Sequence, residues 1–303
     1  MNILITGVSG QLGREVINTA PKSIYGEKIN LILVNRNKLD ISNAYECEKA
    51  IREYKPEWLI NCAAFTNVEK AETEKDMALK VNTQAPRIFA ENLEIYGGKM
   101  IQISTDYVFD GLSNKPYKIN DIKNPLNFYG MTKSLAEDHL GEIFKGKELG
   151  HTIRTSWLIS SVGENFVLKM LALHSKMREI KIINDQIGCP TSTKTVAESC
   201  WKLIDRRINK VPDIPQILHC SDLGEGSWFD LASSIGEIGA HLDLIKKPAK
   251  TIPIKTKEYK TLAKRPHYSV LDCEKTYNLL DLSPSHWKEN LIQILEELKN
   301  KNS

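Results

Sequence analysis

Two residues near the middle of the chain, Tyr129 and Lys133, have the types and spacing of an acid–base pair. They stand four residues apart in NFYGMTKSLAE, at the start of a segment with helical character, and this spacing places two side chains side by side on a helix. An ammonium beside a phenol favours the tyrosinate and lowers the pKa of the phenol towards neutrality, which suits proton transfer to a substrate. Tyr45 and Lys49 show the same spacing in YECEK. Spacing alone therefore does not identify the pair.

The predicted elements around each pair separate the two cases. The pair in YECEK falls within the helix after the second strand, away from the carboxyl edge where doubly wound sheets bind ligands. The pair in NFYGMTK is expected at that ligand edge, and the preceding buried strand ends in the hydroxyls of Ser104 and Thr105. Thr105 can hydrogen-bond the same substrate oxygen as Tyr129. The second pair is the predicted chemical site.

The first strand-like run leads into TGVSGQLG, in which Gly7, Gly10 and Gly13 stand three residues apart. In a loop that holds a pyrophosphate, the first glycine permits a tight turn and the second lets the backbone approach the anion. The third lets the following helix pack closely on the strand. The helix N-terminus adds unpaired N–H groups and a partial positive charge. The loop predicts a dinucleotide site, to which Gln11 and Leu12 are also assigned.

The end of the second predicted strand bears on the choice of cofactor. NAD sites usually carry an acidic residue there for the adenine-ribose hydroxyls, whereas this chain has Asn35 and Arg36. A guanidinium suits a 2′-phosphate, so we predict NADPH, with NADH still open and a solvated loop arginine as the alternative. Asp40 and Ile41 are assigned to the cofactor as well. Asp40 could reach the adenine amino group or cap the helix that follows.

Strand-like and helix-like segments alternate through the first half of the chain. The predicted strands are short apolar runs at 2–6, 29–34, 58–64 and 99–104. Segments of helical periodicity lie between them, at 11–20, 43–54 and 84–97. Buried strands joined by helices indicate a parallel sheet with right-handed crossovers. The predicted fold class is α/β, a Rossmann-type doubly wound parallel sheet with a smaller C-terminal α/β substrate-binding region.

The second half of the chain is less regular. Predicted strands lie at 151–159, 178–185 and 216–220, and predicted helices at 165–176, 196–208 and 284–301. We expect an NADP(H)-binding domain over 1–153, completed by about 191–222. The remaining segments, 154–190 and 223–303, are expected to form the substrate-binding region and to close a cleft over the carboxyl edge of the sheet.

Composition argues against several classes of protein. The 303 residues carry a formal net charge of +3, with Lys and Arg spread along the chain, which gives no support for a nucleic-acid-binding face. No apolar run is long enough to span a membrane, and the N-terminus has no signal-peptide pattern. The six cysteines are isolated, which suits a reducing compartment and argues against structural zinc. We expect a cytoplasmic protein with no nucleic-acid or membrane partner.

The chain carries six motifs in order: TGVSGQLG, NCAAFTNVEKAE, STDYVFDG, NFYGMTK, RTSW and RPHYSVLD. Together they resemble the extended short-chain dehydrogenase/reductases, and within these the dTDP-4-dehydrorhamnose reductase family. The resemblance runs from residue 1 to beyond residue 272, and the combination is far more specific than any single motif. It implies a reductase for the 4-keto group of a nucleotide-linked 6-deoxy sugar.

The resemblance also implies a role for each residue of the site. Thr105, Tyr129 and Lys133 would form a catalytic triad, in which Tyr129 donates a proton to the ketone oxygen while the nicotinamide delivers hydride to the carbon. Lys133 would also hold the nicotinamide ribose. The cofactor would be lined by Ala64, Phe65 and Thr66.

The small-molecule nucleotide-sugar substrate is assigned five residues by the same resemblance. Thr105 and Asp106 would contact the sugar, and Trp157 would pack against it unless it is an ordinary core aromatic. Arg265 suits the diphosphate, since a guanidinium offers a fork of donors, although it could equally belong to a solvated basic loop. Asn165 is a weaker candidate of the same kind.

Related reactions remain to be separated. Dehydratases of the superfamily have an Asp-Glu pair right after the Thr, whereas Tyr107 here cannot act as a carboxylate base. A reductase for a related 4-keto nucleotide sugar stays open, as do an epimerase with the same Tyr and Lys and a non-catalytic NADP-binding regulatory subunit. Some relatives are metal-dependent dimers with acidic residues near the first helix and after a GxPT loop. Glu15 is present, but Lys194 stands where an acidic ligand is expected, so we predict no metal and leave monomer and homodimer open.

Overall fold

The sheet at the centre of the molecule has six parallel strands. The computed structural model describes residues 1–302. The strands follow the order β12-β7-β6-β5-β1-β4, and each neighbouring pair is parallel. Their bounds are Asn2–Thr6 (β1), Asn30–Val34 (β4), Trp58–Asn61 (β5), Lys99–Thr105 (β6), Gly150–Thr155 (β7) and Ile217–His219 (β12).

The strand order reverses at β1. This strand pairs with β4 on one side and with β5 on the other, so that Thr6 lies opposite both Val34 and Asn61. The chain therefore leaves β1 in one direction and later returns to its other side. In open α/β sheets, a reversal of this kind opens a crevice outside the carboxyl ends of the strands.

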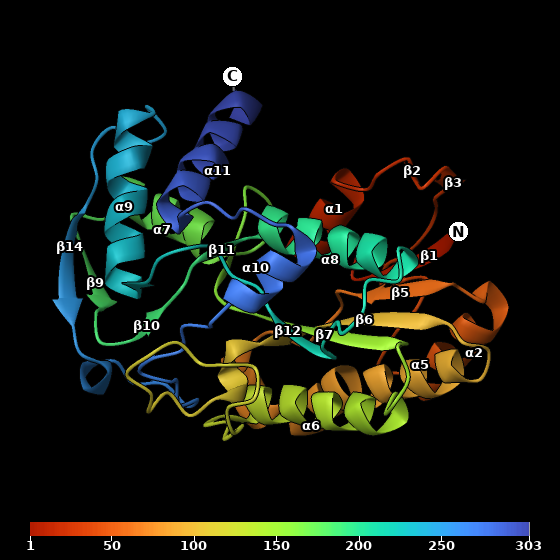
Figure 1. Ribbon diagram of the computed structural model, residues 1–303. Coiled ribbons are helices and arrows are strands. Elements are labelled where there is room, and N and C mark those ends of the chain that lie inside the picture. Colours follow the sequence, from red (N-terminus) through yellow and green to blue (C-terminus); the bar gives the residue numbers. More distant parts are fainter. Residues whose placement is uncertain (303) are drawn as a thin grey trace.

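Helices cover both faces of the sheet (Figure 1). Because both faces are covered, Leu4 is fully buried on one side of β1, and Ile3 and Ile5 are fully buried on the other. One face carries Ala44–Tyr54 (α2), Ala85–Glu94 (α5) and Phe128–Ile143 (α6). The other carries Gln11–Asn18 (α1), Thr193–Ile208 (α8) and Glu274–Leu280 (α10).

A further group of elements lies beside the sheet, and we call it the lateral region (Figure 1). It consists of Phe166–Lys176 (α7), Trp228–His241 (α9), Trp287–Asn302 (α11) and the parallel strands Glu179–Ile183 (β9) and Lys250–Ile254 (β14). Val167, Leu231 and Leu291 are fully buried at its centre. This separate core lets the lateral region form the far wall of a cleft.

Shorter elements join these layers. Two short pairs belong to the second half of the chain: Leu158–Ile159 (β8) with Thr191–Ser192 (β11), and Ile187–Gly188 (β10) with Gly226–Ser227 (β13). A hairpin of Ser23–Ile24 (β2) and Glu27–Lys28 (β3) follows α1. The others are Val68–Thr73 (α3), Lys75–Leu79 (α4), the π-helical turn Lys80–Gln84 (η1), and the 3₁₀ turns Asp106–Val108 (η2) and Thr256–Glu258 (η3).

The predicted fold class is confirmed, and the differences are local. The strand expected over 151–159 is two strands, because Trp157 takes a left-handed backbone with a φ of 41°. The strand expected over 58–64 ends at Asn61, after which the chain turns towards the cavity described below. Sequence patterns did not reveal α3, α4, α9, α10 or β14. The division into two domains stays a prediction, although β12 does join the main sheet, as the expected contribution of 191–222 requires.

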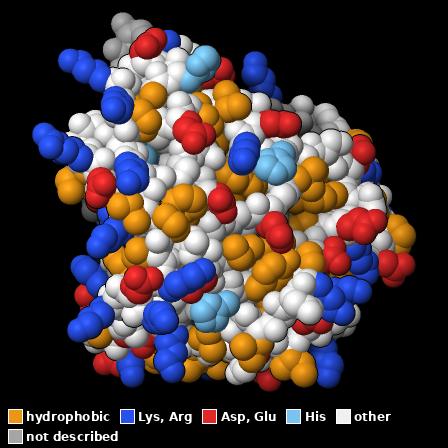
Figure 2. Space-filling model, turned by 90° about the vertical axis from the view of Figure 1, so that its left-hand side faces the viewer, with side chains coloured by type: hydrophobic (Ala, Val, Ile, Leu, Met, Phe, Trp, Pro, Cys, Tyr) orange, Lys and Arg blue, Asp and Glu red, His pale blue; other side chains and the backbone are white. Residues whose placement is uncertain are grey.

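The surface agrees with the charge pattern of the sequence. Figure 2 looks onto the side with α9 and β14, where Lys and Arg side chains are interspersed with Asp and Glu. Within residues 1–302, the structure has no helix that is both long and apolar enough to cross a membrane.

Candidate active site

A cavity of about 810 Å³ lies at the carboxyl edge of the sheet. Its walls come from the ends of β1, β4, β5, β6 and β7, from the first turns of α6, and from the lateral region. Its size and its place at the strand reversal are typical of a ligand pocket. The lining includes every residue that the sequence assigned to the cofactor, together with Thr105, Asp106, Tyr129, Lys133, Trp157 and Asn165.

The glycine loop has the backbone that its sequence predicts. Gly7 has a φ of +66°, and a Cβ there would lie 2.7 Å from the backbone nitrogen of Ala63. A Cβ at Gly13 would collide with the carbonyl oxygen of Gly7. Gly10 precedes α1 and offers no capping side chain, so the first N–H groups of the helix are left for an anion.

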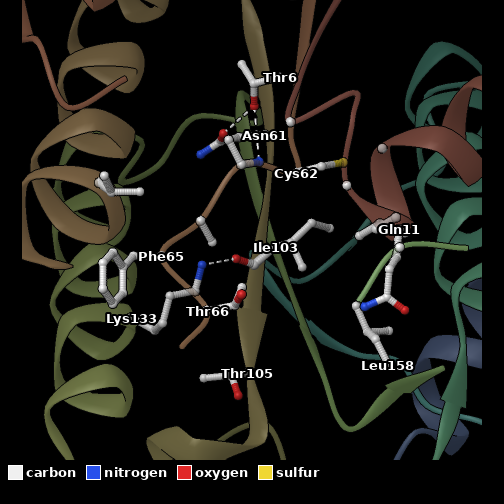
Figure 3. A pocket seen from close by; sticks show the side chains of 18 of the residues that line it. Thr6, Gln11, Asn61, Cys62, Phe65, Thr66, Ile103, Thr105, Lys133 and Leu158 are labelled. Carbon is white, nitrogen blue, oxygen red and sulfur yellow. Dashed lines mark hydrogen bonds between the residues drawn. The ribbon is translucent and has the colours of Figure 1, made fainter. Parts of the chain in front are cut away.

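The side chain of Gln11 contacts the segment that contains Ser160 and Glu164. Its Oε1 accepts a hydrogen bond from the Oγ of Ser160 at 2.9 Å, and its Nε2 donates to the carbonyl oxygen of Glu164 at 3.4 Å. Figure 3 shows Gln11 close to Leu158, on the opposite side of the pocket from Phe65. The segment around Ser160 thereby borders the pyrophosphate loop.

The adenine end lies beyond β4. Arg36 is exposed at the cavity rim, with Asn35 beside it. The Oγ and N of Ser42 donate hydrogen bonds to Asp40, at 2.8 and 3.0 Å, and these bonds hold the pKa of Asp40 below its ordinary value. The alternative that Asp40 caps the next helix is wrong, because Asn43 caps α2 by accepting from two of its first N–H groups.

Asn82 supports the cofactor segment 64–66, and sequence analysis did not identify it. This side chain is 1% exposed. Its Oδ1 accepts from the N–H of Phe65 at 2.8 Å, and its Nδ2 donates to the carbonyl oxygen of Phe65 at 3.0 Å and to the Oγ1 of Thr132 at 3.1 Å. Asn82 lies in η1, and π-helical turns of this kind are frequent at functional sites. One amide thus joins the cofactor wall to α6.

Lys133 points from α6 across the cavity towards β6 (Figure 3). Its Nζ donates to the carbonyl oxygen of Ile103 at 2.5 Å, and the residue is 3% exposed. Burial lowers the pKa of Lys133 to about 8, while the negative charge of Glu137 opposes that change. Phe65 and Thr66, which the resemblance assigns to the cofactor, lie beside this side chain.

Tyr129 and Thr105 come together at the end of β6. Burial raises the pKa of Tyr129 to about 12, and a hydrogen bond with the Thr105 side chain partly offsets the rise. The expected lowering of the Tyr129 pKa by Lys133 is therefore wrong for this structure. The Tyr129 phenol is buried in the cavity wall, whereas the Lys133 ammonium points to the backbone carbonyl of Ile103. A tyrosine with this pKa is protonated at neutral pH, as a proton donor must be.

Asp106 lies behind the triad. Its carboxylate accepts from the Oγ of Ser269 at 2.6 Å and from the Oγ1 of Thr105 at 3.0 Å. Burial raises the pKa of Asp106 to about 7, although both hydrogen bonds counter the effect. Tyr107, the residue that replaces a dehydratase acid, packs edge-on against the Tyr129 ring with 6.1 Å between the ring centres.

Two stacked tryptophans form the lateral wall. The rings of Trp157 and Trp228 lie 3.5 Å apart between centres and are inclined by 5°. The indole Nε1 of Trp157 and the Oγ1 of Thr155 are buried and have no hydrogen-bond partner among residues 1–302. Both residues line the cavity, but these two atoms are themselves covered by protein, and the indole Nε1 lies next to Gly188. The sequence singled out Trp157 but gave no signal for Thr155 or Trp228.

The structure holds the other two substrate candidates by intramolecular contacts. Asn165 caps α7, and its Nδ2 donates to the carbonyl oxygens of Ser160 and Val162 at 3.0 and 3.1 Å. Arg265 forms an ion pair with Glu69 at 2.7 Å and lies outside the set of residues that line the cavity. Their roles towards a substrate stay predictions.

The YECEK pair lies where the sequence placed it. Tyr45 is 65% exposed on α2, outside the cavity lining, and Lys49 pairs with Glu53 on the same helix at 3.6 Å.

Glu15 and Lys194 are the two residues on which the prediction of no metal site rests. Burial raises the pKa of Glu15, and the charges of Glu297, Lys194 and Glu198 also act on it. The described part of the chain contains no group of three or more His, Cys, Asp or Glu side chains that could hold a metal ion.

A family model described as the RmlD substrate binding domain matches residues 1–300. The chain belongs to this family. It is 32% identical over 295 residues to the spore coat polysaccharide biosynthesis protein SpsK of Bacillus subtilis, with 97% of each chain covered. The family match, together with the two reductase structures that follow, confirms the resemblance and the enzyme class predicted from sequence, a nicotinamide-dependent oxidoreductase.

Two solved structures share the whole fold. A dTDP-4-dehydrorhamnose reductase from Clostridium acetobutylicum is 36% identical, with a TM-score of 0.87, and the match covers 99% of this chain and 100% of that one. A dTDP-4-dehydrorhamnose reductase from Bacillus anthracis, solved in complex with NADP, is 30% identical, with a TM-score of 0.83 and coverage of 98% and 99%. Both matches cover nearly the whole of this RmlD-family chain.

Proposed function

We propose that this protein reduces the 4-keto group of a nucleotide-linked 6-deoxy sugar with NADPH, converting dTDP-4-dehydro-L-rhamnose to dTDP-L-rhamnose. The observation that carries the proposal is the convergence of Thr105, Tyr129 and Lys133 in one cavity with the glycine loop. The names of the solved relatives support the same reaction, and one of them was solved with NADP.

Each residue of the triad has a defined part in such a reduction. Tyr129 holds a proton at neutral pH and gives it to the developing alkoxide. Thr105 bonds the Tyr129 side chain and can donate to the same oxygen. Lys133 offers donors to the ribose hydroxyls of the cofactor. The bound nicotinamide supplies the hydride.

The cofactor choice rests on the rim of the cavity. Arg36 is exposed beside the adenine end, where a guanidinium can pair with a 2′-phosphate. We therefore propose NADPH as the preferred cofactor, and the cytoplasm, where such a cofactor is regenerated, as the location.

Tyr129→Phe tests the proposal, because it keeps the ring and removes the proton. We expect kcat to fall by about 10²- to 10⁴-fold while the Kd for NADPH stays within about twofold. Tyr45→Phe is the matched control and should retain full activity. A Tyr129→Phe enzyme with near-normal turnover would contradict the assignment. A parent protein that binds NADPH but reduces no keto sugar would point to a regulatory subunit.

A further inference from the structure

Three contacts join helix α6, which carries the predicted triad residues Tyr129 and Lys133, to the last three residues of strand β6. Tyr129 is hydrogen-bonded to Thr105, Lys133 donates to the carbonyl oxygen of Ile103 at 2.5 Å, and Ser104 donates to a carboxylate one turn further along α6. That carboxylate belongs to Glu137. The first two contacts involve the predicted triad, whereas neither the sequence motifs nor the proposed reaction uses the third.

Glu137 is a buried anion with a complete set of partners. It is 4% exposed, and its Oε1 accepts from the Oγ of Ser104 at 2.6 Å. Arg154 donates a hydrogen bond to each oxygen, with Nε–Oε1 and Nη2–Oε2 distances of 2.9 and 2.7 Å. Lys123 approaches Oε2 to 3.4 Å. Burial alone would favour the neutral acid, but Arg154 holds the pKa of Glu137 below its ordinary value, so the carboxylate is charged.

The charge acts on Lys133 because both residues lie on one side of α6, four residues apart. Burial disfavours the ammonium of Lys133, and Glu137 is the largest effect that opposes it. Cys62 also faces Lys133, but burial raises the pKa of that thiol to about 12, which leaves it uncharged at neutral pH. The titratable or charged groups around this cluster are Tyr129, Cys62, Glu137, Arg154, Lys123, Asp138, which pairs with Lys123, and His219, which contacts Arg154.

We propose that Glu137 is a positioning residue of the catalytic site: through Ser104 it aligns α6 on β6, and its negative charge stabilises the ammonium of Lys133. Arg154 and Lys123 keep that charge in place. Glu137 is not among the residues that line the cavity and lines a separate pocket with Lys123 and Arg154, so the proposal gives it no contact with substrate or cofactor. The inference rests on the proposed function: its turnover measurement depends on the reduction, and its binding measurement only on the proposed contact of Lys133 with the cofactor.

The discriminating experiment is the pH dependence of NADPH affinity in Glu137→Gln, measured by cofactor fluorescence. Without the anion, the pKa of Lys133 falls, so the ammonium is lost at a lower pH. The alkaline decline in affinity should then begin about one pH unit earlier than in the parent protein. Glu137→Asp keeps the charge and should restore the parent profile. The same shift should appear in kcat if the protein is the proposed reductase.

Further variants distinguish the effect of helix alignment from the effect of the Glu137 charge, and both from a general loss of stability. Ser104→Ala removes the third contact but keeps the anion, so it should lower kcat about threefold to tenfold and leave the alkaline decline unmoved. Glu148→Gln is the control: it removes a carboxylate that pairs with Arg207 away from the cavity, and it should change neither kcat nor the alkaline decline in NADPH affinity. Should Glu137→Gln fold poorly, Glu137→Gln with Arg154→Met removes both buried charges and serves in its place.

The outcomes are distinct for each claim. A Glu137→Gln or double variant whose alkaline decline coincides with that of the parent would overturn the role of the charge. A fully active Ser104→Ala would overturn the role in alignment. A parent protein that fails to reduce the keto sugar but shows the predicted shift in NADPH binding would refute the proposed function and leave the effect of Glu137 on Lys133 standing.

Discussion

The replacement Asn82→Ala removes one amide that holds two parts of the site together. Asn82 bonds both backbone groups of Phe65 and the hydroxyl of Thr132 at 2.8–3.1 Å. Each polar group left unpaired in an interior costs about 1–3 kcal/mol. Phe65 lines the cavity, where water can reach its freed backbone groups, so the low end of that range applies. Because the Oγ1 of Thr132 still donates to the carbonyl oxygen of Tyr129 at 2.7 Å, the two Phe65 groups are the ones left unpaired, at about 2 kcal/mol of unfolding free energy. At about 2–3 °C per kcal/mol for a chain of this size, Tm should fall by about 4–6 °C.

The same variant should weaken NADPH binding by about tenfold, because the 64–66 segment loses its support. Thermal unfolding and a fluorescence titration with NADPH measure the two effects. Asn92→Ala is the matched control: its half-buried side chain donates to the carbonyl oxygen of Ile88 within α5, and its loss should cost less than about 1 kcal/mol. The reasoning fails if Asn82→Ala melts within about 2 °C of Asn92→Ala and binds NADPH as the parent protein does.

Three further changes probe other parts of the cavity. Arg36→Ala should raise the Kd for NADPH about tenfold or more and leave that for NADH nearly unchanged; equal effects on both would refute a 2′-phosphate contact. Asp106 binds a proton more tightly in the folded state, where its pKa is about 7, than when unfolded, so the parent protein should lose stability as pH rises from about 4 to 7. Asp106→Asn should flatten that loss, which is at most about 4 kcal/mol in urea unfolding. Gly188→Ala would place a Cβ 2.5 Å from the Trp157 ring and should raise KM for the sugar without altering NADPH binding, whereas Gly141→Ala, in open space, should do neither.

The central sheet was predictable because its strands are buried on both faces. The centre of a run such as NILIT, from Ile3 to Ile5, has no polar side chain to place in water, so its pattern leaves few alternatives to a covered parallel strand. The glycine loop was predictable for a similar reason, since Gly7 and Gly13 occupy positions that no other residue can fill. In both cases the constraint is local, and a single sequence carries it.

The remaining parts depend on contacts between distant segments. Asn82 is an ordinary polar residue in sequence, and its role appears only when Phe65 and Thr132 approach it from two other elements. Trp228 reaches the cavity through the packing of the lateral region on the sheet, where it meets Thr155 at the carboxyl end of β7 as part of the same lining. The pKa of Tyr129 was expected to be lowered but is raised. Helical spacing reveals the nearby charge of Lys133, but it does not reveal the burial that outweighs that charge.

The measurement that bears most directly on the proposed function is the oxidation of NADPH, and separately of NADH, followed by absorbance. The substrate would be the dTDP-4-keto-6-deoxy-L-sugar, generated from its precursor by a preceding epimerase. The account predicts rapid oxidation with loss of the ketone and formation of the 4-hydroxy sugar, faster with NADPH than with NADH. No oxidation of either cofactor, by protein that binds NADPH, would contradict it.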